Sequence, residues 1–220
     1  MTAQVKSKQR VEEHGEVFTN EREVNAMLDM VKQETERIDS RFLEPACGDG
    51  NFLSEVLRRK LAVVGERYGK SQLEYERYMF VAVSSIYGVD IMADNVDECR
   101  ERLYGIAESE YGRRFRDERR VEVLDAIRYL LSKNIQCGDA LTLTAADGDP
   151  IVFPEWSLVK GSKVSRRDFT FAALLNVSTQ APTFDMLDEL EVDRDKLGAA
   201  IPKPIKNYPL TSFLEVAKYE

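Results

Sequence analysis

The chain has 220 residues, of which 43% are hydrophobic and 32% are charged, and its formal net charge is −8. The composition is that of an ordinary folded domain with its own core. The negative charge argues against an autonomous DNA-binding protein, because phosphate contacts need a cationic surface. No apolar run is long enough to span a bilayer, and the polar start, residues 1–10, is unlike a signal peptide. Cys47, Cys99 and Cys137 are widely spaced and there is one histidine, so we expect reduced thiols, no zinc site and a cytoplasmic location.

The first expected element is a helix that begins near residue 20. Apolar side chains at Val24, Met27, Leu28 and Val31 recur at the spacing of one helical face. Thr19 or Asn20 can cap its start. Residues 1–20 are expected to form a flexible lead to this helix.

A glycine-rich turn follows at residues 44–52, which read Glu-Pro-Ala-Cys-Gly-Asp-Gly-Asn-Phe. The hydrophobic residues 41–43 precede it, and an amphipathic segment with apolar positions from Leu53 to Val64 follows. This order predicts a strand, a tight turn and a helix. The two glycines allow close approach of the backbone to a ligand, and the helix start offers unpaired N–H groups.

Two further strands are predicted after this turn. A short helix over 71–80 leads into a strand over 81–90, and two helices with a polar turn at 111–117 lead into a strand over 134–141. These strands end near Asp90 and Asp139. Together with Glu44, the two aspartates would lie at the carboxyl ends of three adjacent strands, which is where ligands bind in doubly wound sheets.

Residues 142–180 are expected to form a β-rich excursion, with arms over 150–160 and 163–171. Trp156 is interpreted as a packing anchor, with base stacking as the alternative. The run over 160–167, which includes the turn between the arms, lacks acidic residues and is the best candidate for a nucleic-acid or partner contact. Its basic side chains are Lys160, Lys163, Arg166 and Arg167. Residues 182–220 are expected to be irregular.

The glycine turn, written acid-Pro-Ala-Cys-Gly-x-Gly-x-Phe, resembles motif I of S-adenosylmethionine (SAM)-dependent DNA adenine methyltransferases from bacterial restriction-modification systems. The resemblance extends over residues 14–141. Residues 15–20 are similar to the Gly-x-x-Tyr/Phe-Thr-Pro segment of that family, with asparagine in place of proline. Residues 88–91 and 134–141 are similar to its Gly-x-Asp-Ile/Leu and Asn-Ile-x-x-Gly-Asp-Ala/Ser-Leu elements.

This resemblance implies a role for each matching residue. Thr19 would close over the methionine end of SAM, Asp90 would hold the ribose, and Asp139 would accept a hydrogen bond from the adenine amino group. An apolar side chain at Ile91 would lie on the adenine. The complete set of implied cofactor residues is Thr19, Glu44, Pro45, Ala46, Cys47, Gly48, Gly50, Phe52, Asp90, Ile91, Asp139 and Ala140.

The catalytic half of the family pattern is missing. Adenine methyltransferases carry an Asn-Pro-Pro-Tyr type of motif at the end of the fourth strand, and no such string occurs here. Residues 181–187 are similar to the start of that strand, but acidic residues follow. Residues 207–210 have the right residue types in the wrong order. No catalytic residue is therefore assigned, and the isolated chain is expected to be inactive or weakly active.

The sequence thus predicts one α/β domain over 1–220, a Rossmann-like SAM-dependent methyltransferase core that could be truncated. Its parts are a lead and helix (1–40), a cofactor-binding half (41–145), and a β excursion with an irregular end (146–220). The expected function is methyl transfer to adenine N6 in DNA, with a partner subunit that supplies catalytic or recognition elements. Two alternatives stay open: a non-catalytic SAM-binding or assembly subunit, and a SAM-dependent enzyme acting on another acceptor.

Overall fold

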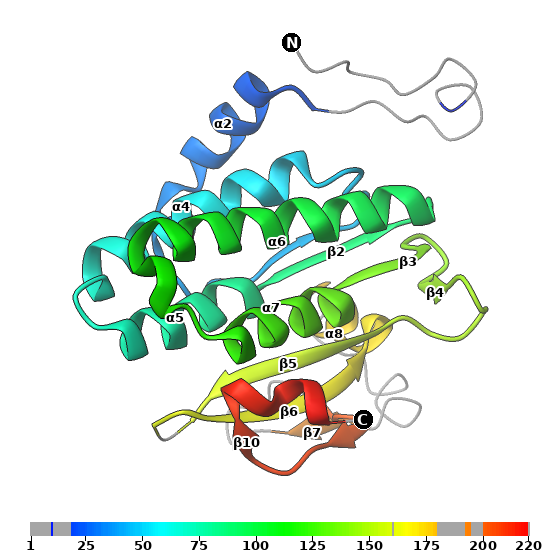
Figure 1. Cartoon of the computed structure of the whole chain (residues 1–220). Coiled ribbons are helices and arrows are strands. Elements are labelled where there is room, and N and C mark those ends of the chain that lie inside the picture. The colour runs from blue at the N-terminus through cyan, green and yellow to red at the C-terminus, as the bar shows by residue number, and fades with distance from the viewer. Residues whose placement is uncertain (1–9, 11–18, 160, 180–191, 195–199, 220) are drawn as a thin grey trace.

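The computed structural model describes residues 10, 19–159, 161–179, 192–194 and 200–219, and it has a mixed α/β architecture (Figure 1). Helices separate the first three strands along the chain, and most of the later strands follow one another directly. Within the described ranges, no helix is both long and apolar enough to cross a membrane.

The sheet that carries the predicted motifs has four strands in the order β1-β2-β3-β4. β1 (Phe42–Glu44), β2 (Ile86–Asp90) and β3 (Ile135–Asp139) run parallel, and β4 (Thr144–Ala145) pairs antiparallel with β3. Glu44 and Asp90 close the first two strands, and Asp139 closes the third. The expected convergence of three acids on one edge of the sheet is therefore confirmed.

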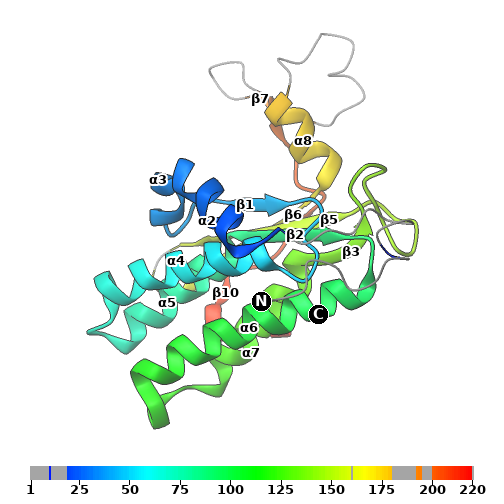
Figure 2. The same ribbon diagram turned by 90° about the horizontal axis from the view of Figure 1, so that it is seen from above.

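Four long helices make the connections between the parallel strands. α4 (Asn51–Tyr68) and α5 (Gln72–Ser84) join β1 to β2, and α6 (Ala93–Phe115) and α7 (Val121–Asn134) join β2 to β3, with a short 3-10 turn η1 (Arg116–Glu118) between the last two. α4 packs against α5 and α6, and α7 packs against the same two helices. Figure 2 shows the four helices along one side of the sheet. Their apolar side chains form the main core.

The N-terminal helix begins where its cap was expected. α2 (Glu21–Met30) is capped by Asn20, whose side-chain oxygen accepts the backbone N–H of Glu23 at 3.0 Å. α3 (Lys32–Glu36) follows, and both helices pack on α4. Val24 and Leu28 are buried, whereas Met27 is 43% exposed. Only half of the predicted apolar stripe is therefore covered by the described residues.

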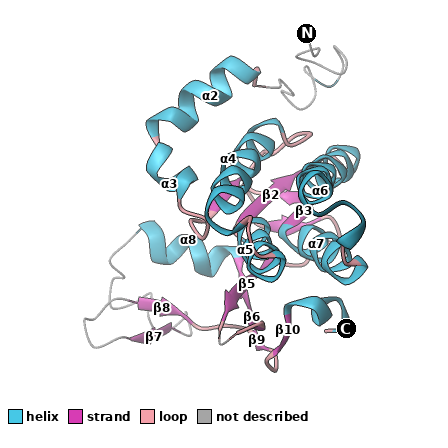
Figure 3. Ribbon diagram, turned by 60° about the vertical axis from the view of Figure 1, so that its left-hand side comes forward, coloured by secondary structure: helices cyan, strands magenta, loops and turns pink. Residues whose placement is uncertain are grey.

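The predicted β excursion is also present. β5 (Val152–Leu158) and β6 (Lys163–Thr170) form an antiparallel pair, and β9 (Lys206–Asn207) and β10 (Thr211–Ser212) pair with β6 (Figure 3). The other elements are α8 (Phe171–Thr179), the pair β7 (Val192–Arg194) and β8 (Ala200–Pro202), and the 3-10 segment η3 (Phe213–Lys218). Trp156 is only 7% exposed and its Nε1 donates to Asn134 Oδ1 at 2.9 Å, so it is a packing anchor.

Three sequence expectations are wrong about local structure. Residues 81–84 belong to α5 rather than to the second strand, because a short apolar run fits a buried helix as well as a strand. Residues 111–115 continue α6 instead of forming a turn; Tyr111 is fully buried and its hydroxyl accepts the N–H of Arg120 at 3.0 Å. The described part of the end that was expected to be irregular contains four short strands and η3, and Phe213 and Val216 of η3 are buried in the main core.

Candidate functional site

A cavity of about 780 Å³ opens at the carboxyl ends of β1, β2 and β3, within the size range of small-molecule sites. We call it the acidic cavity. Its lining includes every predicted cofactor residue except Gly50. The complete lining is Thr19, Leu43, Glu44, Pro45, Ala46, Cys47, Gly48, Asp49, Asn51, Phe52, Asp90, Ile91, Met92, Asn95, Gly138, Asp139, Ala140, Leu141, Phe171 and Leu175.

The glycine turn adopts a backbone that ordinary residues rarely take. Gly48 has φ +52° and Gly50 has φ +85°, a left-handed conformation that favours glycine. Gly50 precedes α4, and a Cβ atom there would lie 2.7 Å from Cys99 Sγ on α6. Gly50 thus lets the turn pack on α6, whereas Gly48 lies in the cavity wall.

Asp90 organises this turn from the neighbouring strand. Its Oδ2 accepts the backbone N–H of Gly48 at 2.8 Å. Its Oδ1 accepts the backbone N–H of Met92 at 2.9 Å and the side-chain amide of Asn95 at 3.2 Å. Asp90 is therefore already engaged in shaping the cavity, a role that the sequence pattern did not indicate.

Glu44 has the opposite environment. Its side chain is largely buried, and within the described part of the chain its Oε2 atom has no hydrogen-bond partner. Burial, together with the nearby carboxylates of Asp90 and Asp49, raises the pKa of Glu44 to about 8. At neutral pH this carboxyl group is mostly protonated, and a cation beside it would favour its ionised form.

Asp49 and Asn51 are lining residues that sequence reasoning missed, although they lie inside the predicted motif. Asp49 Oδ2 pairs with Arg102 Nη2 at 2.6 Å, and the same guanidinium contacts Asn51. Phe171 and Leu175 were also missed. They come from α8, far along the chain, and no sequence pattern linked them to the turn.

The rim of the acidic cavity is apolar. Ile91 is 56% exposed and Leu141 is 95% exposed. Leu141 donates its backbone N–H to Asp139 Oδ1 at 2.8 Å, which holds the loop after β3 against that strand. Such exposed apolar side chains beside a cavity are suited to contact with a flat or apolar part of a ligand.

The electrostatics of the acidic cavity favour a positively charged ligand. Four carboxyl groups line it, from Glu44, Asp49, Asp90 and Asp139, and its described lining contains no lysine, arginine or histidine. Backbone N–H groups at the start of α4 offer a local site for a negative group. The arrangement therefore suits a ligand with a dominant positive charge and an apolar or aromatic part.

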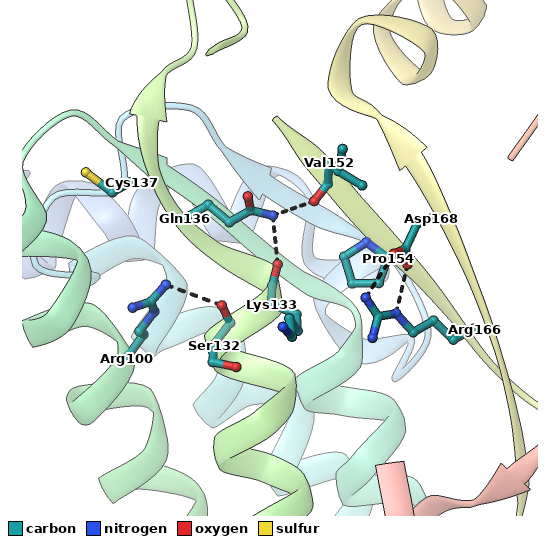
Figure 4. A pocket seen from close by; sticks show the side chains of 9 residues that line it. All are labelled: Arg100, Ser132, Lys133, Gln136, Cys137, Val152, Pro154, Arg166 and Asp168. Carbon is teal, nitrogen blue, oxygen red and sulfur yellow. Dashed lines mark hydrogen bonds and ion pairs between the residues drawn. The ribbon is translucent and has the colours of Figure 1, made fainter. Parts of the chain in front are cut away.

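The predicted basic contact is not a continuous surface. Arg166 is buried, and its Nε and Nη2 donate to the two Asp168 oxygens at 2.8 and 2.9 Å (Figure 4). Its Nη1 donates to the Tyr129 hydroxyl at 2.7 Å. Its guanidinium also lies 4.2 Å from the Tyr208 ring centre. The expectation of a DNA contact at Arg166 is therefore wrong, because its donors are directed into the protein.

The other residues of this group are divided. Arg167 is partly exposed, but its Nε donates to Glu155 at 2.8 Å. Lys163 is exposed on β6, and Lys160 lies outside the described residues, as does the 181–187 segment. Among the described residues of this group, only Lys163 still fits the exposed basic contact that the sequence suggested.

Across the described ranges, no group of three or more His, Cys, Asp or Glu side chains is arranged to hold a metal ion. In comparisons with known proteins, no family model, no curated protein and no solved structure matches this chain.

Proposed function

We propose that the acidic cavity binds SAM and that the chain is a DNA adenine methyltransferase-like protein of the restriction-modification type. The observation that carries this proposal is the convergence of eleven residues, selected from sequence resemblance alone, on one cavity. They come from four separate segments, around Thr19, Glu44, Asp90 and Asp139. A chance glycine turn gives no reason for the other three segments to meet it.

The chain's own groups fit this cofactor. SAM carries a sulfonium and an ammonium group, and when bound it supplies an electrophilic methyl group. Among the residues that the structure describes, one buried oxygen of Glu44 has no partner, and a positive charge would satisfy it. Gly48, with its positive φ, permits close approach of the ligand to the backbone. The exposed side chain of Ile91 can cover an adenine face.

The topology is consistent with a truncated Rossmann-like methyltransferase core. Three parallel strands joined by helices are the repeating unit of such folds. In the described residues β1 pairs with β2 alone, so the sheet lacks a strand on the outer side of β1. In such folds the ligand binds at the strand whose neighbours on its two sides belong to the two halves of the sheet. In a complete core of this type, further strands would therefore pair with the free side of β1.

Methyl transfer to adenine N6 would require more than this chain. The target base has to leave the duplex, and a polar and aromatic clamp must then hold its amine. No Asn-Pro-Pro-Tyr type of motif occurs in the sequence. We therefore propose that DNA and a partner subunit complete the active site.

The second candidate is a non-catalytic SAM-binding or assembly subunit. The net charge of −8 and the burial of Arg166 favour it, because both weaken direct contact with DNA. It predicts the same cofactor affinity as the first candidate but no methylation with any partner.

Calorimetry tests cofactor binding directly. We expect saturable binding of SAM by the chain, and a strong loss in Glu44→Gln. The matched control is Asp125→Asn, which removes an exposed carboxylate on α7 outside the cavity and should leave the affinity unchanged. No heat at millimolar SAM with folded protein would refute the proposal. Labelled SAM and unmethylated DNA, with and without the proteins encoded beside this one, then separate the two candidates.

A further inference from the structure

A second cavity, of about 600 Å³, lies at the opposite end of the same sheet. We call it the arginine cavity. The loop before β1 forms one wall, and the end of α4, the outer face of α5 and the end of β5 form the others. Arg41 and Ser85 lie in its lining immediately before β1 and β2. The acidic cavity begins where these strands end, so the two sites are on the order of 15 Å apart along the strands.

Four guanidinium groups line this cavity, from Arg37, Arg41, Arg67 and Arg77. Asp39 is the one acidic residue in the described lining. This excess of positive charge occurs in a chain whose acidic residues outnumber its basic ones by 39 to 31. The arginines also come from three different elements, so their convergence is a property of the fold rather than of one charged helix face.

The acidic partners of these arginines do not saturate them. Arg37 lies 3.7 Å from Glu34 and 3.9 Å from Asp39, which are long ion pairs between exposed groups. Arg41 pairs with Glu155 at 2.6 Å, but Glu155 also pairs with Arg167. Shared and exposed pairs of this kind contribute little to stability, so a stronger anion can replace them.

Arg67 and Arg77 have donors left over. Arg67, in the last turn of α4, has no ion pair with any described residue. Arg77 pairs with Glu74 through Nη1 at 2.6 Å, and its buried Nε finds no acceptor in the described chain. A buried donor without an acceptor is costly, and an oxyanion in the cavity would supply one.

The wall behind the arginines also contains a lysine. Lys60 is fully buried, and its Nζ donates to the Ile38 carbonyl at 3.0 Å and to the Ser85 hydroxyl at 2.7 Å. Both acceptors belong to residues of the lining. The stacked rings of Tyr68 and Tyr78, with centres 3.7 Å apart, form an aromatic side of the same cavity.

We propose that the arginine cavity binds a phosphate group, either of a free nucleotide or of a nucleic-acid backbone. The planar guanidinium fork matches phosphate oxygens in pairs. The four forks around this hollow are paired only in part, because Arg67 has no ion pair with a described residue and Arg41 shares its carboxylate with Arg167. The inference is independent of SAM binding, because the two cavities share no lining residue.

Trp156 provides the measurement, since it lines this cavity and is the single tryptophan of the chain. The full chain is titrated at low salt with inorganic pyrophosphate while tryptophan fluorescence is followed. We expect a saturable change that weakens at higher salt. Arg67→Gln should weaken the apparent affinity by about fivefold or more, equivalent to about 1 kcal/mol.

The matched control is Arg58→Gln. Arg58 is exposed on the same helix, has no ion pair with the described residues and does not line the cavity. Its replacement should leave pyrophosphate binding unchanged. Urea midpoints equal to that of the wild type show that both variants are folded. Equal losses in Arg67→Gln and Arg58→Gln, or no saturable change at about 10 mM pyrophosphate, would overturn the proposal.

A short DNA duplex then separates the two sources of the phosphate. If the duplex competes with pyrophosphate and loses affinity in Arg67→Gln, the cavity binds a nucleic-acid backbone. If pyrophosphate binds and the duplex does not compete, the phosphate belongs to a small nucleotide. Either result supports a phosphate site at the end of the sheet opposite the acidic cavity.

Discussion

The backbone N–H of Gly48 donates to the Asp90 carboxylate at 2.8 Å, across 42 positions of sequence. This bond ties the turn after β1 to the end of β2. The same carboxylate also accepts the Met92 N–H and the Asn95 amide. One buried side chain therefore holds together the parts of the cavity wall that the two strands contribute.

Asp90→Ala is expected to destabilise the chain by about 2–4 kcal/mol, because several donors lose a charged acceptor in a buried place. Asp90→Asn should cost less, since its carbonyl oxygen can keep part of the set. Urea denaturation measures both. A stability of Asp90→Ala equal to that of the wild type within experimental error would contradict the role assigned to this carboxylate. A loss of SAM binding in Asp90→Ala counts as a cofactor effect only if the variant is still folded.

The stability of the protein should depend on pH through Glu44. The pKa of Glu44 is raised from 4.5 to about 8 in the folded state, so between these values the folded state binds more protons than the unfolded state. Stability from this group is therefore lost as the pH rises from about 4.5 to about 8, and it is constant above that range. Glu44→Gln, which stays neutral, should escape this loss.

Urea denaturation of wild type and Glu44→Gln near pH 5 and near pH 8.5 tests this sign. The advantage of Glu44→Gln should grow by an amount on the order of 3–5 kcal/mol over that interval. Parallel stability curves for the two proteins would mean that Glu44 ionises normally.

Binding of SAM should release a proton from the same group. At pH 7 a carboxyl group with a pKa of about 8 is roughly nine-tenths protonated. A sulfonium placed beside it favours the carboxylate, so the release approaches one proton per bound SAM. Calorimetry in two buffers with different ionisation enthalpies measures this number. S-adenosylhomocysteine, which lacks the sulfonium charge, should release fewer protons, and equal release for both ligands would argue against a contact between Glu44 and the sulfur centre.

The sequence was sufficient to predict the parts of the cavity that depend on local pattern. The glycine turn with its flanking strand and helix, the Asn20 cap and the acids at the strand ends all follow from short-range order. The parallel pairing of β1, β2 and β3 follows from their helical connections, because parallel strands need such crossovers.

Long-range packing is what the sequence could not supply. Nothing local distinguishes Arg166, which is buried against Asp168, from Arg167, which is partly exposed on the next position of β6. Strand alternation sends the two side chains to opposite faces, but only the packed structure says which face is covered. The place of Phe171 in the lining of the acidic cavity has the same origin.

Gly50→Ala should destabilise the protein, although Gly50 does not line the acidic cavity. The φ of +85° disfavours a side chain, and the new Cβ would lie 2.7 Å from Cys99 Sγ. The two effects together are expected to cost about 2–4 kcal/mol. The control is Gly105→Ala on α6, where a Cβ meets no atom within 4 Å and the helix should be slightly stabilised. Thermal unfolding of the two variants should move in opposite directions.

Lys60 should make the stability of the protein depend on pH in a second range, above that of Glu44. Burial lowers the pKa of Lys60 from 10.5 to about 7, so between these values the unfolded state binds more protons than the folded state. Stability from this group therefore rises as the pH increases from about 7 to about 10.5, the reverse of the Glu44 effect and in a higher range. Lys60→Met removes the titration together with the hydrogen bonds to Ile38 and Ser85.

Below pH 7 Lys60 is charged and buried in the folded wild type, which lowers the stability of the wild type relative to Lys60→Met. As the pH rises towards 10.5 the wild type should gain on the order of 3–5 kcal/mol relative to the variant. Urea midpoints at intervals across this range measure the difference. A gap between the two proteins that does not change with pH would show that the ammonium is stabilised by its carbonyl and hydroxyl partners as well as it is by water.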